Sequence, residues 1–86
     1  WQSATSHYQT ALKLAPLEAE LWFRLGACLR RSGDPAEALQ YLEKSTLLSP
    51  ETAAYETEKG DALQQLRRLD EAVVAYNRAR ELEPRN

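Results

Sequence analysis

Apolar residues recur every three to four positions through most of the chain, with polar and charged residues between them. This spacing is typical of amphipathic helices that bury one face. Short stretches that contain Pro, Gly, Asp or Ser interrupt it, as expected of tight connections. The pattern therefore predicts an all-α fold. The expected helices span residues 1–15, 19–32, 35–48, 52–66 and 69–83.

The same residue types return every 34 positions. Pro16, Pro50 and Pro84 keep this step, and Gly26 returns as Gly60. A fixed period of this length indicates stacked helix–turn–helix units, each of which buries its apolar face only against its neighbours. We therefore expect one array rather than several domains. Its expected parts are residues 1–18 as the second helix of a partial unit, 19–52 as a first complete unit and 53–86 as a second.

The turns inside the two complete units differ in chemistry. Asp34 and Pro35 form a clear helix start, because Asp can cap the first turn and Pro suits its first position. Gly33 can close the preceding helix in a left-handed conformation. Arg67 stands at the equivalent place in the second unit. We expect that turn to be looser, or to close without a left-handed residue.

Composition excludes several classes of function. The chain has 86 residues and a net charge of −2, which does not favour nucleic-acid binding. No apolar stretch approaches the length of a membrane span, so direct membrane insertion is not expected. Trp1 falls at the position of Pro35 and Leu69, and we expect the chain to begin at the second helix of a unit within a longer protein.

Candidate chemistry is sparse. His7 is the only histidine and is expected on a helix surface, while Cys28, the only cysteine, lies in an apolar helical pattern that favours packing over redox chemistry. The sequence contains no phosphate-binding glycine loop, paired metal-ligand spacing or nucleophile elbow. We therefore expect no enzyme activity and assign no catalytic residue, no metal site and no cofactor.

Residues 19–52 resemble the tetratricopeptide repeat, whose pattern places Trp, Leu and Gly in a first helix and Ala and Pro in and after a second. The matching residues are Trp22, Leu25, Gly26, Leu29, Ala38, Leu42, Ser45 and Pro50. A second copy is matched by Gly60, Leu63, Ala72, Tyr76, Ala79 and Pro84, and part of a preceding copy by Ala4, Tyr8, Ala11 and Pro16. The resemblance implies a right-handed superhelical α-solenoid of antiparallel helices, and a scaffold within a larger protein that holds a partner's peptide or helix in a concave groove.

The resemblance places the groove on the first helix of each unit. Helix 19–32 carries a net positive charge and helix 52–66 a net negative one, so a partner would meet a basic strip beside an acidic one. Solvated helix faces without function are the alternative. Phe23 is the expected aromatic anchor for an apolar partner residue, unless its neighbours cover it. The implied groove residues are Glu20, Phe23, Arg24, Ala27, Arg30, Arg31, Ala54, Thr57, Glu58, Asp61, Gln64 and Gln65.

One specialised groove of this family holds the acidic C-termini of chaperones with Lys or Arg and Asn. The corresponding positions here hold Phe23 and Ala27 in the first unit and Thr57 and Asp61 in the second. A chaperone tail is therefore not the expected ligand.

The second unit departs from the repeat pattern at two core positions, where Glu56 and Lys59 replace Trp and Leu. One interpretation is an ion pair between them near the edge of the array, with Tyr55 or the stem of Lys59 covering the gap. The other is a polar notch that contacts another chain or domain. A rotated helix would instead bury Tyr55.

Two further functions stay open. Apolar residues near the ends of the array could support self-association by stacking, and the array could recruit substrates for a multidomain enzyme or a secretion assembly. The residues expected to border exposed apolar patches are Trp1, Tyr8, Val73 and Tyr76.

Overall fold

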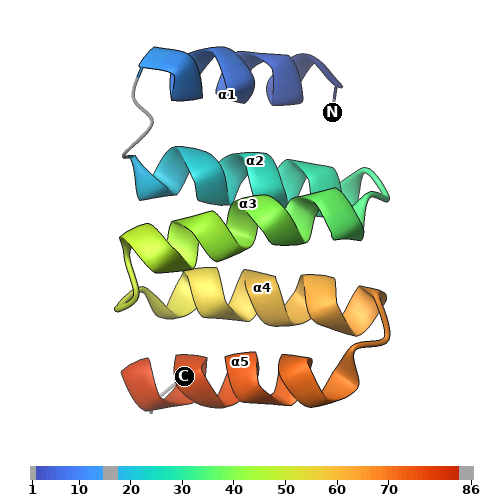
Figure 1. The fold of residues 1–86 in the computed structure, drawn as a ribbon, viewed down its shortest axis with the longest axis vertical. Coiled ribbons are helices and arrows are strands. Elements are labelled where there is room, and N and C mark those ends of the chain that lie inside the picture. The colour runs from blue at the N-terminus through green and yellow to red at the C-terminus, as the bar shows by residue number, and fades with distance from the viewer. Residues whose placement is uncertain (1, 15–17, 84–86) are drawn as a thin grey trace.

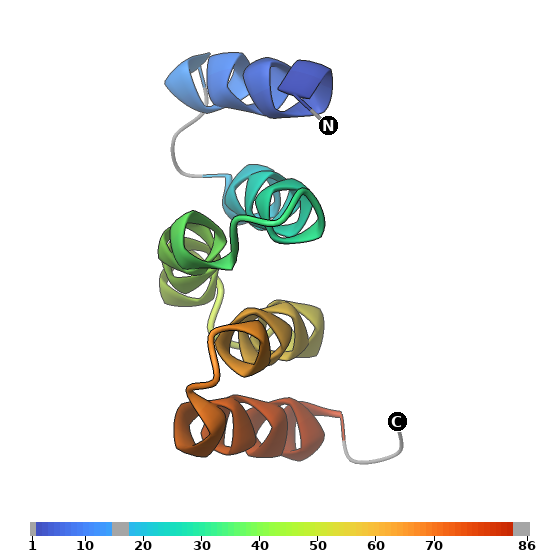
Figure 2. The same ribbon diagram turned by 90° about the vertical axis from the view of Figure 1, so that its right-hand side faces the viewer.

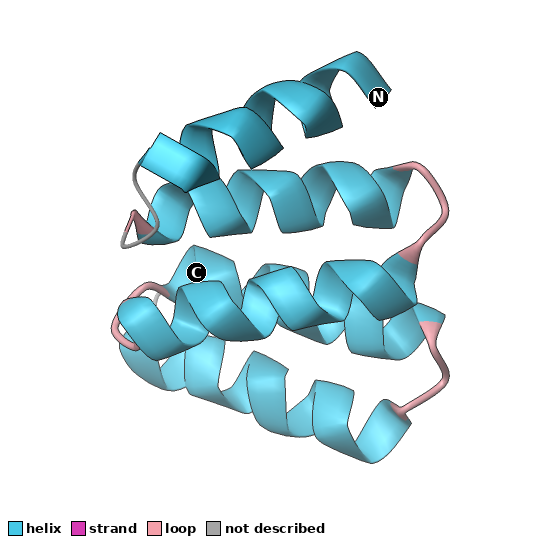
Figure 3. Ribbon diagram, turned by 45° about the horizontal axis from the view of Figure 1, so that its top comes forward, coloured by secondary structure: helices cyan, strands magenta, loops and turns pink. Residues whose placement is uncertain are grey.

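A computed structural model describes residues 2–14 and 18–83 of the chain. Five antiparallel helices joined by short loops make up this part of the molecule, which contains no strand (Figure 3). The helices are α1 (Gln2–Leu14), α2 (Ala19–Arg31), α3 (Pro35–Leu48), α4 (Ala53–Gln65) and α5 (Leu69–Leu82). The five expected helices and the all-α class are confirmed.

The helices stack in chain order along the longest axis of the molecule (Figure 1). Seen from the side, α2 and α4 lie in one layer and α3 in another, so the stack zigzags (Figure 2). α2 packs most closely against α3, and α4 against α5, while α3 joins the two pairs. Each helix therefore buries its apolar face mainly against its immediate neighbours, as the 34-residue period predicts.

Large side chains of one helix fit against glycines of the next. Leu42 is fully buried against Gly26, where an added Cβ would lie 2.7 Å from the Leu42 Cγ atom. Gly60 makes the equivalent approach in the second unit, with 2.7 Å between an added Cβ and Cε1 of Tyr76. Cys28 is also buried, as expected of a packing residue. The repeated glycines therefore set the spacing between the two helices of each unit.

The turn after α4 corrects the expectation for Arg67. This arginine has a φ of 64°, in the left-handed region, as does Gly33 with a φ of 95°. Both turns make the same closing bond: the N–H of Asp34 donates to Leu29, and that of Arg68 to Leu63, each at 2.9 Å. The prediction of a looser turn was wrong, because packing of α5 on α4 requires the same backbone path and outweighs the strain at one residue.

Replacing Arg67 with glycine should stabilise the protein by roughly 0.5–1 kcal/mol, because glycine adopts positive φ without a steric penalty. The reciprocal change, Gly33→Arg, should destabilise by a similar amount, since an added Cβ there has no neighbour within 4 Å and only the backbone conformation is strained. Urea unfolding of both variants tests this. Stabilities that do not move in opposite directions would contradict it.

Glu56, one of the two polar residues that replace core residues in α4, pairs with another helix rather than with Lys59. Glu56 is only 4% exposed and accepts a hydrogen bond from Nε of Arg78 at 3.3 Å, so the expected pair with Lys59 is not the one that forms. Tyr55 is buried as well, with its ring 4.7 Å from that of Phe23. α4 therefore buries side chains on two sides, one toward α2 and one toward α5.

Side chains near the two ends of the described array differ from one another in exposure. Val73 and Val74 of α5 are 56% and 60% exposed, whereas Tyr76 is half-buried. His7 is exposed and lies edge-on to Tyr8, with 5.7 Å between the ring centroids. Trp1, Pro16 and Pro84 lie outside the described residues. Self-association through apolar ends stays a prediction.

Candidate protein-interaction groove

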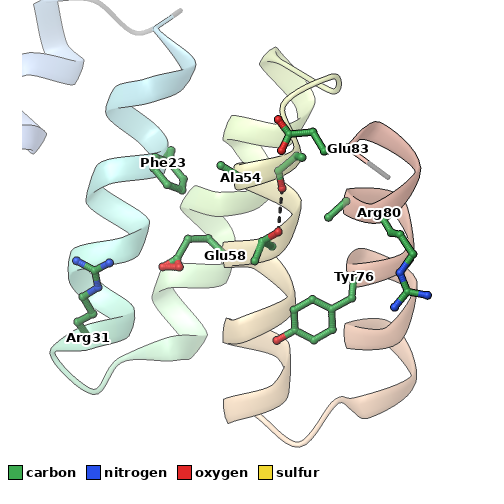
Figure 4. Close-up of a pocket in the computed structure, with 10 residues that line it drawn as sticks. Phe23, Arg31, Ala54, Glu58, Tyr76, Arg80 and Glu83 are labelled. Carbon is green, nitrogen blue, oxygen red and sulfur yellow. Dashed lines mark hydrogen bonds between the residues drawn. The ribbon is translucent and has the colours of Figure 1, made fainter. Parts of the chain in front are cut away.

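A hollow of about 550 Å³ opens between α2, α4 and α5 (Figure 4). Small side chains from α4 and α5 line it, and Phe23 of α2 stands beside them. Ala54 and Thr57 share one face of α4 because they are three residues apart. Alanine at these positions leaves the space that a larger side chain would fill. The small residues are Ala53, Ala54, Thr57 and Ala79.

Phe23 is both a groove residue and a packing residue. It lines the hollow, yet it is half-buried, and its ring is tilted by 32° against that of Tyr55 at 4.7 Å. Burial raises the pKa of the Tyr55 hydroxyl above its ordinary value. Because the buried Tyr55 packs against its ring, Phe23 is positioned in the structure without a bound partner. Its role as an anchor stays a prediction.

An ion pair crosses from α2 to α4 along the groove. Nη2 of Arg30 donates to Oε1 of Glu58 at 2.9 Å, and Nε of Arg30 donates to the same oxygen at 3.0 Å. Both side chains are largely buried, with 19% and 11% of their surface exposed. Arg30 and Glu58 were expected to add to a basic and an acidic strip, but they pair with each other. The two strips as a surface for a partner stay a prediction. The long-range contacts of Glu56 likewise run to α5 rather than to the groove.

Tyr76 links α5 to the C-terminal end of α4, next to the turn between the two helices. Its hydroxyl donates to Oδ1 of Asp61 at 2.5 Å and lies 3.0 Å from Oε1 of Gln64. Burial, and then this bond to Asp61, raise the pKa of Tyr76 to about 12. The hydroxyl is therefore neutral at physiological pH and acts as a donor. Asp61 and Gln64 of α4 are thus linked to α5 through one hydroxyl.

The structure separates the implied groove residues into three groups. Those that line the hollow are Phe23, Arg31, Ala54, Thr57 and Glu58. Those that line a neighbouring hollow near the turns are Arg30, Asp61, Gln64 and Gln65. The third group lies apart from both: Glu20 and Arg24 form an exposed pair at 3.4 Å, and Ala27 is buried at 7% exposure.

Sequence reasoning missed the contribution of α5. The hollow is bordered by Tyr76, Ala79 and Arg80 of α5 and by Glu83, which directly follows α5 (Figure 4). The resemblance assigned the groove to the first helix of each unit, and the linear pattern contains no signal that residues of α5 border the same hollow as Phe23 of α2. Arg31 and Arg80, both exposed, bring two guanidinium groups to its edges.

Within residues 2–14 and 18–83, no group of three or more His, Cys, Asp or Glu side chains could hold a metal ion. No helix in these ranges is long and apolar enough to cross a bilayer.

Family models of the tetratricopeptide repeat match residues 19–52 and 57–86. The two segments make up more than half of the chain. The chain therefore belongs to the tetratricopeptide repeat family, and its fold is that family's all-α helical repeat.

Two curated relatives carry the repeat within much longer proteins. The chain is 39% identical over 61 residues to the inactive TPR repeat-containing thioredoxin TTL3 of Arabidopsis thaliana, covering 71% of this chain and 9% of the relative. It is 29% identical over 84 residues to protein O-mannosyl-transferase TMTC3 of Homo sapiens, covering 98% of this chain and 9% of the relative. The chain thus spans about a tenth of the length of either protein.

Solved structures match the whole array. PcrH, in complex with the chaperone binding region of PopD, superposes with a TM-score of 0.94 at 26% identity, over 100% of this chain and 65% of that one. MamA gives 0.91 at 26% identity, over 96% and 48%. The first TPR of Spaghetti (RPAP3), bound to an HSP90 peptide, gives 0.93 at 24% identity over 95% and 65%, and supports the fold alone.

Proposed function

We propose that this chain is a protein–protein interaction scaffold, and that it holds a segment of a partner protein in the hollow between α2, α4 and α5. The observation that carries the proposal is a preformed hollow with an alanine-rich lining and a supported aromatic ring at its edge. Such a surface accepts an apolar side chain with little rearrangement. The complex of PcrH with a region of PopD supports it, because that structure matches the whole of this chain.

The charges around the hollow favour a partner segment of particular chemistry. Glu58 is already paired with Arg30, whereas Arg31 and Arg80 bring exposed positive charge to opposite edges. We therefore expect an apolar residue of the partner against Phe23, with acidic residues on either side. An acidic chaperone tail is not the ligand that we propose, since the residues at the family's clamp positions carry no positive charge.

The array is proposed to bind rather than to catalyse. Tetratricopeptide repeats are generally non-catalytic interaction modules, and the array would recruit partners on behalf of a longer protein. A relative that is named as a mannosyltransferase carries the matching segment in 9% of its length. A recruiting role beside an enzymatic domain or within a secretion assembly is consistent with this proposal.

Ala54→Arg tests the groove, because Ala54 is exposed and lines the hollow, and a long side chain there would fill part of it. We expect binding of a partner to weaken at least about tenfold, the equivalent of 1.4 kcal/mol. Ala36→Arg makes the same change at an exposed position of α3, away from the hollow, and should leave binding unchanged.

The measurement has two stages. Proteins captured from source-cell extract by wild type and by both variants are compared by quantitative mass spectrometry, and the affinity of each selectively captured partner is then measured by fluorescence anisotropy. Circular dichroism must show that all three proteins are folded. Equal capture by Ala54→Arg and wild type would contradict binding in this groove.

A further inference from the structure

A further hollow, of about 300 Å³, lies between α3, α4 and α5, apart from the two described above. Glu56 and Lys59 line it. Each follows a groove residue by two positions, Glu56 after Ala54 and Lys59 after Thr57, and a step of two positions leads to the opposite side of a helix. The hollow is therefore separate from the groove. We call it the α3–α5 notch, and it is lined chiefly by Glu43, Leu47, Pro50, Glu56, Lys59 and Arg78.

The notch contains a buried carboxylate that is only half satisfied. Oε2 of Glu56 accepts a hydrogen bond from Arg78 at 3.3 Å. Oε1 of Glu56 is buried, with less than 1 Å² exposed, and has no hydrogen-bond partner among the described residues. A buried acceptor without a donor is energetically unfavourable, and native structures rarely contain one. What the notch lacks is therefore a hydrogen-bond donor.

Comparison of the two units indicates what kind of group would carry the donor. Glu56 and Arg78 stand 34 residues after Trp22 and Lys44. In the first unit the ammonium of Lys44 lies 5.8 Å from the centre of the Trp22 ring, which stacks on Tyr41 at 5.6 Å. The second unit keeps the cation and lacks both aromatic rings. Arg78 therefore occupies the place of a cation that faces a ring, with no ring from this chain to face.

The remaining lining favours a neutral occupant with an apolar body. Two carboxylates, Glu43 and Glu56, are balanced by two cations, Lys59 and Arg78, so a charged occupant gains no net attraction. Leu47, 74% exposed, and Pro50 add apolar surface at the rim. Such surroundings suit an aromatic ring that carries its own donor.

We propose that the α3–α5 notch binds an aromatic side chain with an N–H or O–H donor, tryptophan or tyrosine, from a partner protein. Its donor bonds to Oε1 of Glu56 and its ring lies against the Arg78 guanidinium. Because Oε1 of Glu56 has less than 1 Å² exposed, the occupant reaches it only after a side chain at the rim moves, and we propose that the half-buried, flexible Lys59 is the one that moves. This site is independent of the groove, so either can fail without the other.

Indole and 1-methylindole test the proposal on wild-type protein, since they share a ring and differ in the donor. Each is titrated into the ¹⁵N-labelled chain, and amide shifts of α4 and α5 are followed by NMR. We expect indole to shift Lys59 and Arg78 and to bind there about tenfold more tightly than 1-methylindole, the effect of one hydrogen bond to a charged acceptor. Equal affinities, or shifts confined to the groove, would overturn the proposal.

Two variants and one competitor sharpen the result. Glu56→Leu should abolish the difference between the two probes, whereas Glu43→Gln, which changes a rim carboxylate, should preserve it. n-Butylammonium represents a basic side chain and should bind at the notch more weakly than indole. If n-butylammonium bound more tightly than indole, the occupant would be a lysine rather than an aromatic side chain, and the proposal would be overturned. The comparison of probes on the wild type stands even if Glu56→Leu does not fold.

Discussion

Leu42→Ala is expected to destabilise the protein by about 3–5 kcal/mol, the upper range for removing a fully buried leucine. Leu42 has no exposed surface and packs on Gly26, and the glycine has no side chain that could move into the space left behind. A chain of this size is marginally stable, so such a loss would leave a large unfolded fraction at 25 °C. Urea unfolding followed by circular dichroism measures the change.

Leu47→Ala is the matched control, because it makes the same chemical change on the same helix at a residue that is 74% exposed. It should alter stability by less than about 0.5 kcal/mol. If the two variants lost similar stability, the layer formed by Leu42 and Gly26 would not be the core of the array.

Glu58→Ala is expected to destabilise by about 2–3 kcal/mol, because it leaves the guanidinium of Arg30 in a largely buried position without its carboxylate. A double-mutant cycle with Arg30→Ala should give a coupling energy of at least 1 kcal/mol, within the range of about 0.5–3 kcal/mol for contacting residues. The cycle is measured by urea unfolding at low salt.

The exposed pair of Arg24 and Glu20 provides the control, since 53% and 61% of their side-chain surface is exposed. Its coupling should be much smaller than that of Arg30 with Glu58, because solvent and salt screen exposed pairs. A coupling for Arg30 and Glu58 as small as this would mean that the pair does not hold α2 against α4.

Local rules account for the features that were predicted correctly. Helix starts and ends depend on residues within one or two turns, such as Asp34 with Pro35, and the structure places each helix end within a residue of its expected position wherever it is described. Gly33 likewise acts locally, through the left-handed backbone conformation of its own turn. The 34-residue period then determines which helix packs on which.

Contacts between helices account for the predictions that were wrong. A pair of Glu56 with Lys59 one turn away was one interpretation of the sequence, yet the Glu56 carboxylate bonds to Arg78, 22 residues further on. Arg30 was expected to add to a basic strip, yet it pairs with Glu58 on another helix. Helical periodicity shows which side a residue occupies but not which residue faces it, and that choice depends on the distance and angle between helices.

The five helices, their stacking order and the family of the chain could all be predicted from the amino-acid sequence, because each depends on local chemistry or on a period that can be counted. Three features became visible only in the folded chain: α5 borders the groove beside Phe23, Arg67 adopts a left-handed conformation, and one oxygen of Glu56 is buried without a donor. These features arise from packing between helices, where a small change in angle brings together side chains that are far apart in the chain.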